Sequence, residues 1–237
     1  MIIGKIVKSD SHINYVCQIY GPHEVEVQPA PTDYAFGRFV RIAVRSSQAE
    51  DPDVALNRAL GIHLEPITYA VGVIYDTILV NPAYGSLGPR LSNETQVELF
   101  SPDYISEKAV MIYVMVLGMM EQRPAAPGTG DGRPETLATM HGIPLLSLEL
   151  GSEIETMTDE DVRAFHFFRD GPAGPGRQEP YLHMGYLPHI IAQRNSLLPM
   201  VTLQIIEQLE RLFPQNRALL SIVKRNFAWR LKVETTG

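Results

Sequence analysis

The chain has 237 residues, 45% of them hydrophobic, so it is long enough to bury a substantial core. Its formal net charge of −7 excludes general affinity for nucleic acid or anionic membranes, so any such contact has to come from a local patch. The single cysteine, Cys17, excludes an intramolecular disulfide and fits a reducing compartment, so we expect a cytoplasmic protein. We expect neither a secretion signal nor a membrane span, because the longest apolar stretch, residues 109–120, is much shorter than a span.

Short antiparallel strands are predicted in the first 44 residues. Runs of β-branched and aromatic residues alternate there with Gly, Pro, Asn and Asp, which is typical of such strands. The predicted strands are Ile2–Val7, Tyr15–Tyr20 and Phe39–Val44, with a fourth considered at Glu24–Val27. Early acidic residues followed by spaced Ala and Leu then predict a short helix over residues 48–61, inserted among the strands.

Further strands are predicted at residues 67–80 and 95–100. Residues 109–120 are apolar on both faces, so a strand buried on both sides and a core helix compete, and the β-branched residues favour the strand. The segment 123–142 is rich in Pro and Gly and predicts a loop. Residues 143–150, IPLLSLEL, are predicted to form the last strand.

From residue 151 onward the pattern becomes helical. Thr158 followed by Asp161 approximates a capping box at the start of a helix. The Gly- and Pro-rich residues 169–180 are the candidate linker, and further helices are predicted at residues 181–195, 197–213 and 216–232. The chain is therefore expected to be α+β, with a strand-rich domain at 1–150 and a helical lobe at 151–237.

The strand pattern that carries Gly4, Tyr15, Gly37 and Val40 resembles the HAS-barrel. This small antiparallel β-barrel stands at the N-terminus of HerA-type DNA translocases and of rotary ATP synthase subunits. The resemblance continues through AVGVIYDTILVNP, VMVLGMM and HGIPLLSLELGSEI, and so extends over most of the strand-rich region. It implies a barrel that packs against neighbours in a ring or docks a partner.

The motor that follows the barrel in the translocases has no counterpart in this sequence. Such a motor opens with a phosphate-binding loop of the form G-x-x-x-x-G-K-[ST], whereas the one Gly-Lys pair here is Gly4-Lys5, inside the first strand. The glycines of residues 128–134, GTGDGRP, lack the strand-to-helix context of a phosphate site. The resemblance therefore implies the barrel without the ATPase.

Patterns for catalysis or metal binding are weak. His183 and His189 are six residues apart and do not share a helical turn, and one cysteine cannot supply the usual structural zinc sets. Cys17 lies in a strand, where a nucleophilic thiol would lack exposure and a partner that lowers its pKa. The acidic residues of the segment 149–161 are explained as charges at a helix N-terminus. We therefore expect no enzyme, no cofactor and no metal site.

Two groups of residues are candidates for binding. Polar side chains in the last part of the predicted strand 67–80 and on the turn-rich backbone that follows it form the candidate partner site, namely Asp76, Asn81, Tyr84 and Arg90. Basic residues of the last helix, in a stretch without acids, form the candidate polyanion site, namely Arg217, Lys224, Arg225, Arg230 and Lys232. Phe227 and Trp229 lie among them and could stack on bases. The structural alternative is a solvated helix face whose aromatic residues belong to the core.

The expected function is a non-catalytic assembly or adaptor protein that self-associates or docks on a translocase or another ATPase ring, such as a HerA-like ATPase. The absent phosphate loop, combined with the barrel pattern, is the basis of this expectation. The alternative is a nucleic-acid-associated protein of DNA processing that uses the basic last helix.

Overall fold

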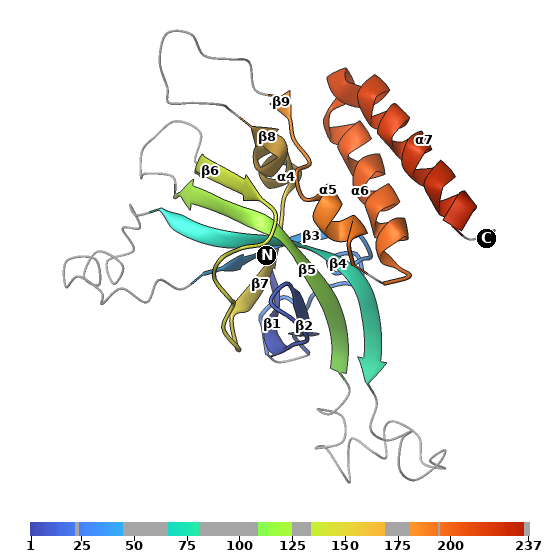
Figure 1. The fold of residues 1–237 in the computed structure, drawn as a ribbon. Helices are drawn as coiled ribbons and strands as arrows, with labels where there is room; N and C mark the ends of the chain where they lie inside the picture. Colours follow the sequence, from blue (N-terminus) through green and yellow to red (C-terminus); the bar gives the residue numbers. More distant parts are fainter. Residues whose placement is uncertain are drawn as a thin grey trace, which may run out of the picture.

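An antiparallel sheet of seven strands and a set of C-terminal helices make up the computed structural model, which confirms the α+β class (Figure 1). The structure describes residues 1–21, 24–44, 66–80, 109–124, 134–168, 181–193 and 195–234, with side chains described as far as Trp229. The helix expected at residues 48–61, the strand expected at 95–100 and the candidate linker at 169–180 lie outside these ranges.

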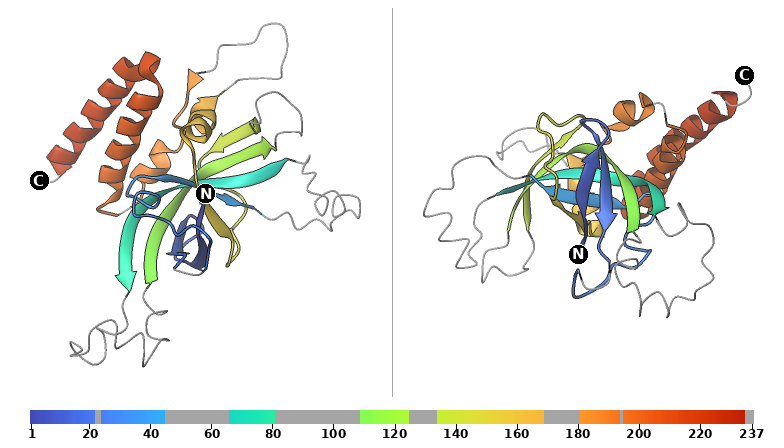
Figure 2. Two further views of the ribbon diagram at one scale, coloured as in Figure 1. Left: turned by 180° about the vertical axis from the view of Figure 1, so that it is seen from behind. Right: turned by 90° about the horizontal axis from the view of Figure 1, so that it is seen from below.

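The strands of the sheet are β1 (Ile2–Ser9), β2 (Asn14–Ile19), β3 (Phe39–Ala43), β4 (Ile67–Val80), β5 (Ala109–Arg123), β6 (Glu135–His141) and β7 (Glu153–Thr156). Their order is β2-β1-β7-β3-β4-β5-β6, and β2 also pairs with β5. The six strands β1, β7, β3, β4, β5 and β2 are therefore paired in a closed ring, in which β2 pairs with both β1 and β5. In the view from below, the sheet curls so that β1 and β2 lie across from β3 and β4 (Figure 2).

Five of the predicted strands are confirmed, at β1 to β5, including the choice of strand over helix for residues 109–120. Three other predictions are wrong. Residues 135–141 of the predicted loop form β6, because the Pro residues of that segment and its Gly residues other than Gly142 all precede this stretch. Residues 143–150 form no strand, and the next strand along the chain is β7. Glu24–Val27 likewise forms turns and bends instead of a strand.

Two hydrophobic cores lie on opposite faces of the long strands β4 and β5. Successive side chains of a strand point to opposite faces, so Ile112 and Val114 face one core while Met115 and Leu117 face the other. The first core lies inside the ring of strands and includes Cys17. The second lies between the sheet and the helices. This arrangement explains why residues 109–120 are apolar on both faces.

Short elements and helices follow β7. They are α4 (Asp159–His166), the strand pair β8 (Phe167–Phe168) and β9 (Tyr181–Leu182), α5 (Leu187–Ile191), α6 (Leu198–Leu212), the 3-10 turn η2 (Pro214–Asn216) and α7 (Arg217–Glu234). The helices predicted at 197–213 and 216–232 are confirmed as α6 and α7. The helix predicted at 181–195 is shorter than expected, because Leu182 pairs with Phe167 and Pro188 lies in the first turn of α5.

The sheet and the helices share several close attachments. The strand β7 lies beyond residue 150 and yet is inserted between β1 and β3, so the sheet includes a strand from the region expected to be the helical lobe. Gly37, just before β3, has a φ of 80° and faces the side chain of Gln204 in α6. A Cβ atom at Gly37 would lie 2.7 Å from Cγ of Gln204, so the glycine lets α6 approach the sheet closely.

Candidate functional site

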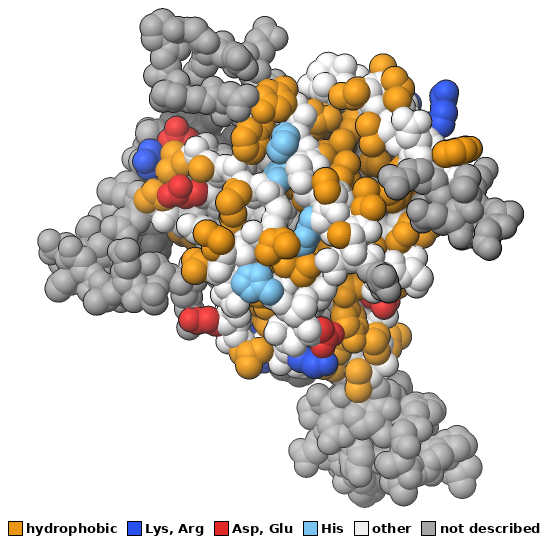
Figure 3. All heavy atoms as spheres, viewed as in Figure 1, with side chains coloured by type: hydrophobic (Ala, Val, Ile, Leu, Met, Phe, Trp, Pro, Cys, Tyr) orange, Lys and Arg blue, Asp and Glu red, His pale blue; other side chains and the backbone are white. Residues whose placement is uncertain are grey.

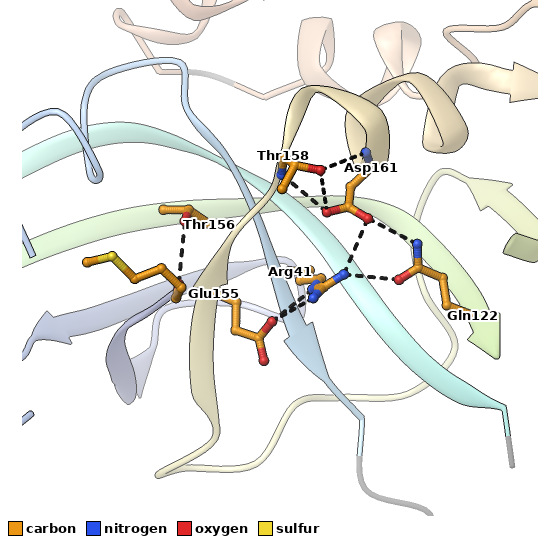
Figure 4. Close-up of polar contacts among 7 residues, drawn as sticks. Arg41, Gln122, Glu155, Thr156, Thr158 and Asp161 are labelled. Atoms are coloured by element: carbon orange, nitrogen blue, oxygen red, sulfur yellow. Dashed lines mark hydrogen bonds and ion pairs between the residues drawn. The ribbon is translucent and has the colours of Figure 1, made fainter. Parts of the chain in front are cut away.

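A polar network around Arg41 joins three strands to α4 (Figure 4). Arg41 of β3 donates from Nε to Oε2 of Glu155 in β7 at 2.9 Å, and its Nη2 forms an ion pair with the same oxygen at 2.9 Å. Its Nη1 donates to Oε1 of Gln122 in β5 at 3.0 Å. Oδ1 of Asp161 in α4 lies 3.4 Å from Nη1 of Arg41 and accepts a bond from Nε2 of Gln122 at 3.2 Å. The other oxygen of Asp161 accepts from the backbone N–H and the hydroxyl of Thr158.

The network is structural, because its carboxylates are already occupied by fixed donors. Asp161 also completes the capping box that the sequence predicts, since its backbone N–H donates to the hydroxyl of Thr158. Both oxygens of Asp161 therefore accept hydrogen bonds, which leaves it poorly suited to act as a base. Sequence reasoning explained this residue as helix N-terminal charge and did not foresee its partners in β3 and β5.

Arg41→Met is expected to lower the free energy of unfolding by about 2–3 kcal/mol, because it leaves the partly buried Glu155 and the buried Asp161 without their cation. Arg123→Met is the matched control, since Arg123 also lies on a strand and pairs with a glutamate, Glu135, but both side chains are exposed. Arg123→Met should lower the free energy of unfolding by less than about 1 kcal/mol. Urea unfolding followed by circular dichroism measures both, and equal costs would contradict the structural role of the Arg41 network.

Three histidines and Tyr186 form an aromatic cluster between β6, α4 and β9. The ring of His166 is fully buried, donates from Nδ1 to the carbonyl of Val162 at 2.7 Å and accepts at Nε2 from the hydroxyl of Tyr186 at 2.6 Å. His141 accepts from the backbone N–H of Gly185, donates to the carbonyl of Phe165 and stacks on His183. Figure 3 shows histidine side chains at the surface between the sheet and the helices.

Burial shifts the acid–base behaviour of this cluster. It lowers the pKa of His166 to about 3 and the pKa of His141 to about 4, with the neighbouring His183 adding to the effect at His141. Burial also raises the pKa of Tyr186. All three groups are therefore neutral near pH 7. The hydrogen bonds from His166 to Val162 and from Tyr186 to His166 both lie inside the core. Sequence reasoning considered only one pair, His183 and His189, and missed this cluster, because its members come from separate elements.

Neither a reactive thiol nor a metal centre is apparent in the described ranges. Cys17 is fully buried, and burial raises the pKa of its thiol to about 12, so a nucleophilic role is disfavoured. No three His, Cys, Asp or Glu side chains among the residues with described positions are grouped so that they could hold a metal ion.

Only one member of the candidate partner site lies in the described part of the chain. Asp76 is in β4, and its Oδ1 accepts from the backbone N–H of Thr77 at 2.8 Å. Asn81, Tyr84 and Arg90 lie outside the described residues, so their relation to Asp76 stays a prediction. The strand continues beyond Asp76 with three consecutive exposed apolar residues, Ile78, Leu79 and Val80.

The candidate polyanion residues all lie in α7, but they differ in their surroundings. Lys224 is held by two acids of α6, with Nζ 2.9 Å from Oε1 of Glu207 and 3.6 Å from Oε2 of Glu210. The hydrogen bond to Glu207 raises the pKa of Lys224. Arg217 and Arg225 are exposed, whereas the side chains of Arg230 and Lys232 lie beyond those described. The charge of Lys224 is therefore already compensated within the molecule.

The helix α7 has apolar side chains on two faces. Leu220 is buried and Val223 is partly buried in the core shared with α6. Leu219, Ile222 and Trp229 lie on another face and are 54%, 57% and 66% exposed. Figure 1 shows α7 as the outermost helix, with α6 between it and the sheet. We call Leu219, Ile222 and Trp229 the outer face of α7.

The outer face was missed by sequence reasoning, although its signal is present in the sequence. The sequence pattern assigns Trp229 to the polyanion site or to the core of its helix. The intervals of three and seven residues that separate Leu219, Ile222 and Trp229 place them together on a helix. That α6 covers the opposite side could not be read from the spacing.

Comparison with known proteins places the chain in a family. No helix among the described residues is long and apolar enough to cross a membrane. A search of curated proteins gives no match. A family model described as a domain of unknown function, DUF8166, matches residues 1–56 and 61–236. Because this match extends over nearly the whole chain, the protein belongs to the DUF8166 family.

Proposed function

We propose that this protein is a non-catalytic assembly or adaptor module of the cytoplasm. The ring of paired strands, read together with the resemblance of its sequence, supports a small β-barrel of the HAS type. In this proposal the barrel provides a rigid body, and the helices attached to it through the second core carry the binding surface. The partner class is a translocase or another ATPase ring, or further copies of the chain.

The outer face of α7 is the observation that carries the proposal. Large apolar side chains gathered on one face of a helix are typical of surfaces that are covered in an assembly. Figure 3 shows hydrophobic side chains over much of the helical part of the molecule. Asp161 of the Arg41 network accepts hydrogen bonds at both oxygens, and His166 and Tyr186 are fully buried, which favours binding over catalysis.

A second exposed apolar group supports the same proposal. Ile143, Leu145, Leu146 and Leu150 are exposed on the segment between β6 and β7, with Leu145 at 92%. This segment is held in place, because His12 bonds to the carbonyl of Pro144 and the hydroxyl of Ser147, and the hydroxyl of Tyr15 accepts from the N–H of Leu148. Fixed backbone with leucines directed to solvent suits a contact surface better than it suits a free monomer.

The alternative function, nucleic-acid binding through α7, is less well supported. Phosphate contacts depend on free cationic side chains, and Lys224 is engaged by Glu207 and Glu210. Leu219 and Ile222, which lie on the exposed side of the helix, offer no phosphate or base contact. Among the candidate cations whose side chains are described, that leaves Arg217 and Arg225 exposed, on a chain of net charge −7.

Native mass spectrometry of the protein isolated from its own cell tests the proposal. The mass should exceed the 26.4 kDa of one chain, either by a multiple of that mass or by a co-purifying partner. A mass equal to one chain, without a partner at any concentration tested, would remove the adaptor proposal. Co-purifying nucleic acid, lost steeply as salt rises, would favour the alternative instead.

A further inference from the structure

The outer face of α7 has the spacing of a helix-packing seam. Leu219, Ile222, Asn226 and Trp229 follow one another at intervals of three, four and three residues, which is the a-d-a-d pattern of a heptad repeat. All four side chains are exposed. Asn226 is thus a polar residue at one a position, a device that fixes register between packed helices at some cost in stability.

Three of the five e and g positions beside this seam are basic, and the other two are Ala218 and Val223. In the same register Arg225 and Lys232 take g positions and Arg230 takes an e position, and no acid occurs in α7 before Glu234. Positions e and g border the seam and select the partner by charge. Glu207 and Glu210 of α6 form ion pairs with Lys224.

This charge pattern disfavours a second copy of the chain as the occupant. In a parallel pair of α7 helices, the g position of Arg225 would face the e position of the other copy, which is Arg230. In an antiparallel pair, g positions face g positions and e positions face e positions, so basic residues would again meet. Like charges at these positions are destabilising, whereas an acidic partner would form attractive pairs with all of them.

A membrane surface fits the same observations less well. A helix that lies in a bilayer interface presents a wide apolar face, whereas this seam is narrow and contains Asn226 at its centre. The net charge of −7 also opposes approach to anionic lipids.

From this seam and its basic borders, we propose that the outer face of α7 binds an amphipathic helix of a protein partner that carries acidic residues beside its own apolar seam. The inference rests on the proposed adaptor function and names the class of partner. Leu219, Ile222 and Trp229 supply the apolar contact, Asn226 sets the register, and Arg225 selects the acidic helix.

The chain has one tryptophan, Trp229, so its fluorescence reports directly whether the outer face is covered. The probe is a synthetic helix of four heptads, with Leu at a and d except for one central Asn at a, and Glu at e and g. The matched control peptide has Lys at e and g. Adding the Glu peptide to the full chain should shift the emission of Trp229 to the blue, and it should bind at least about fivefold more tightly than the Lys peptide.

Two variants of the full chain test the assignment of roles. Ile222→Asp should abolish the shift, and because Ile222 is exposed the variant should keep its fold, as checked by circular dichroism. Arg225→Glu should reduce or reverse the preference for the Glu peptide. The inference is overturned by equal binding of the two peptides, or by no shift with either. A blue shift that needs only a higher protein concentration, or only vesicles of phosphatidylcholine and phosphatidylserine, would also overturn it.

Failure of this inference can be told apart from failure of the adaptor function. If Ile222→Asp isolated from its own cell keeps the native mass of the wild-type assembly, the assembly uses another surface and only the role of α7 is lost. If the wild-type protein itself has the mass of one chain without a partner, the adaptor function is lost whatever the peptides show.

Discussion

Gly4→Ala is expected to lower the free energy of unfolding by about 3 kcal/mol or more. Gly4 lies in β1, between β2 and β7, and a Cβ atom there would come within 2.1 Å of the backbone oxygen of Gln18 in β2. The same atom would lie 3.0 Å from Cα of Ile19. Because both neighbours are backbone atoms, relief requires β1 and β2 to separate and to lose ladder hydrogen bonds at a strand pair that closes the ring.

Gly21→Ala is the control for this substitution. Gly21 follows β2, and a Cβ atom there would meet nothing closer than a side-chain oxygen of Glu24 at 3.6 Å, an ordinary contact. Gly21→Ala should change the free energy of unfolding by no more than about 0.5 kcal/mol. Urea unfolding of both variants, followed by circular dichroism, gives the two costs. A Gly4→Ala protein as stable as Gly21→Ala would show that β1 and β2 do not approach as closely as the structure has them.

The strands of the ring could largely be predicted, because their patterns are local. β-branched residues bounded by turn residues mark β1 to β4, and the apolar run of residues 109–120 was correctly assigned to a strand with two buried faces. The order of the strands could not be predicted in this way. β7 consists of only four residues, EIET, and its place between β1 and β3 depends on Ile154 entering the inner core and on Glu155 meeting Arg41.

Residues 143–150 show why an apolar pattern alone misled the prediction. A run of Ile and Leu residues is typical of a buried strand, but here Leu145 and Leu150 face solvent and the next segment enters the sheet. Apolar residues that are buried only against a partner look the same in a sequence as residues of the core. The same ambiguity applies to Leu219 of α7. The outer face of α7 could therefore be recognised only once the structure showed which side chains are exposed.

Acid is expected to destabilise the protein steeply between pH 6.5 and pH 5. The pKa of His166 is about 3 in the folded protein, against an ordinary value near 6.5 in the unfolded chain, so the unfolded state binds the proton first as the pH falls. The stabilisation by neutral His166 is therefore complete above pH 6.5 and decreases below it. The slope is about 1.4 kcal/mol per pH unit, which gives about 2 kcal/mol at pH 5.

His141, with a pKa of about 4, also lowers the free energy of unfolding as the pH falls from 6.5 to 5. The interval isolates histidines, because ordinary carboxylates titrate near pH 4. Protonation of Nε2 in His166 would also remove the hydrogen bond from Tyr186 and leave a charge in the core. Since a domain is ordinarily stable by about 5–15 kcal/mol, these losses are large enough to displace the unfolding midpoint in urea clearly.

His166→Gln separates the contribution of this residue from other effects of acid. The variant should be less stable than the wild type at pH 7, because Gln does not reproduce the bonds to Val162 and Tyr186. Its stability should nevertheless fall less steeply, by about 1.4 kcal/mol per pH unit less, between pH 6.5 and 5. His12→Gln is the matched control, since His12 contacts Pro144 and Ser147 away from the cluster and leaves His166 in place. If the wild type and His166→Gln lose stability at the same rate, His166 is not buried as a neutral ring, and the cluster does not hold the helices on the sheet in the way that its hydrogen bonds indicate.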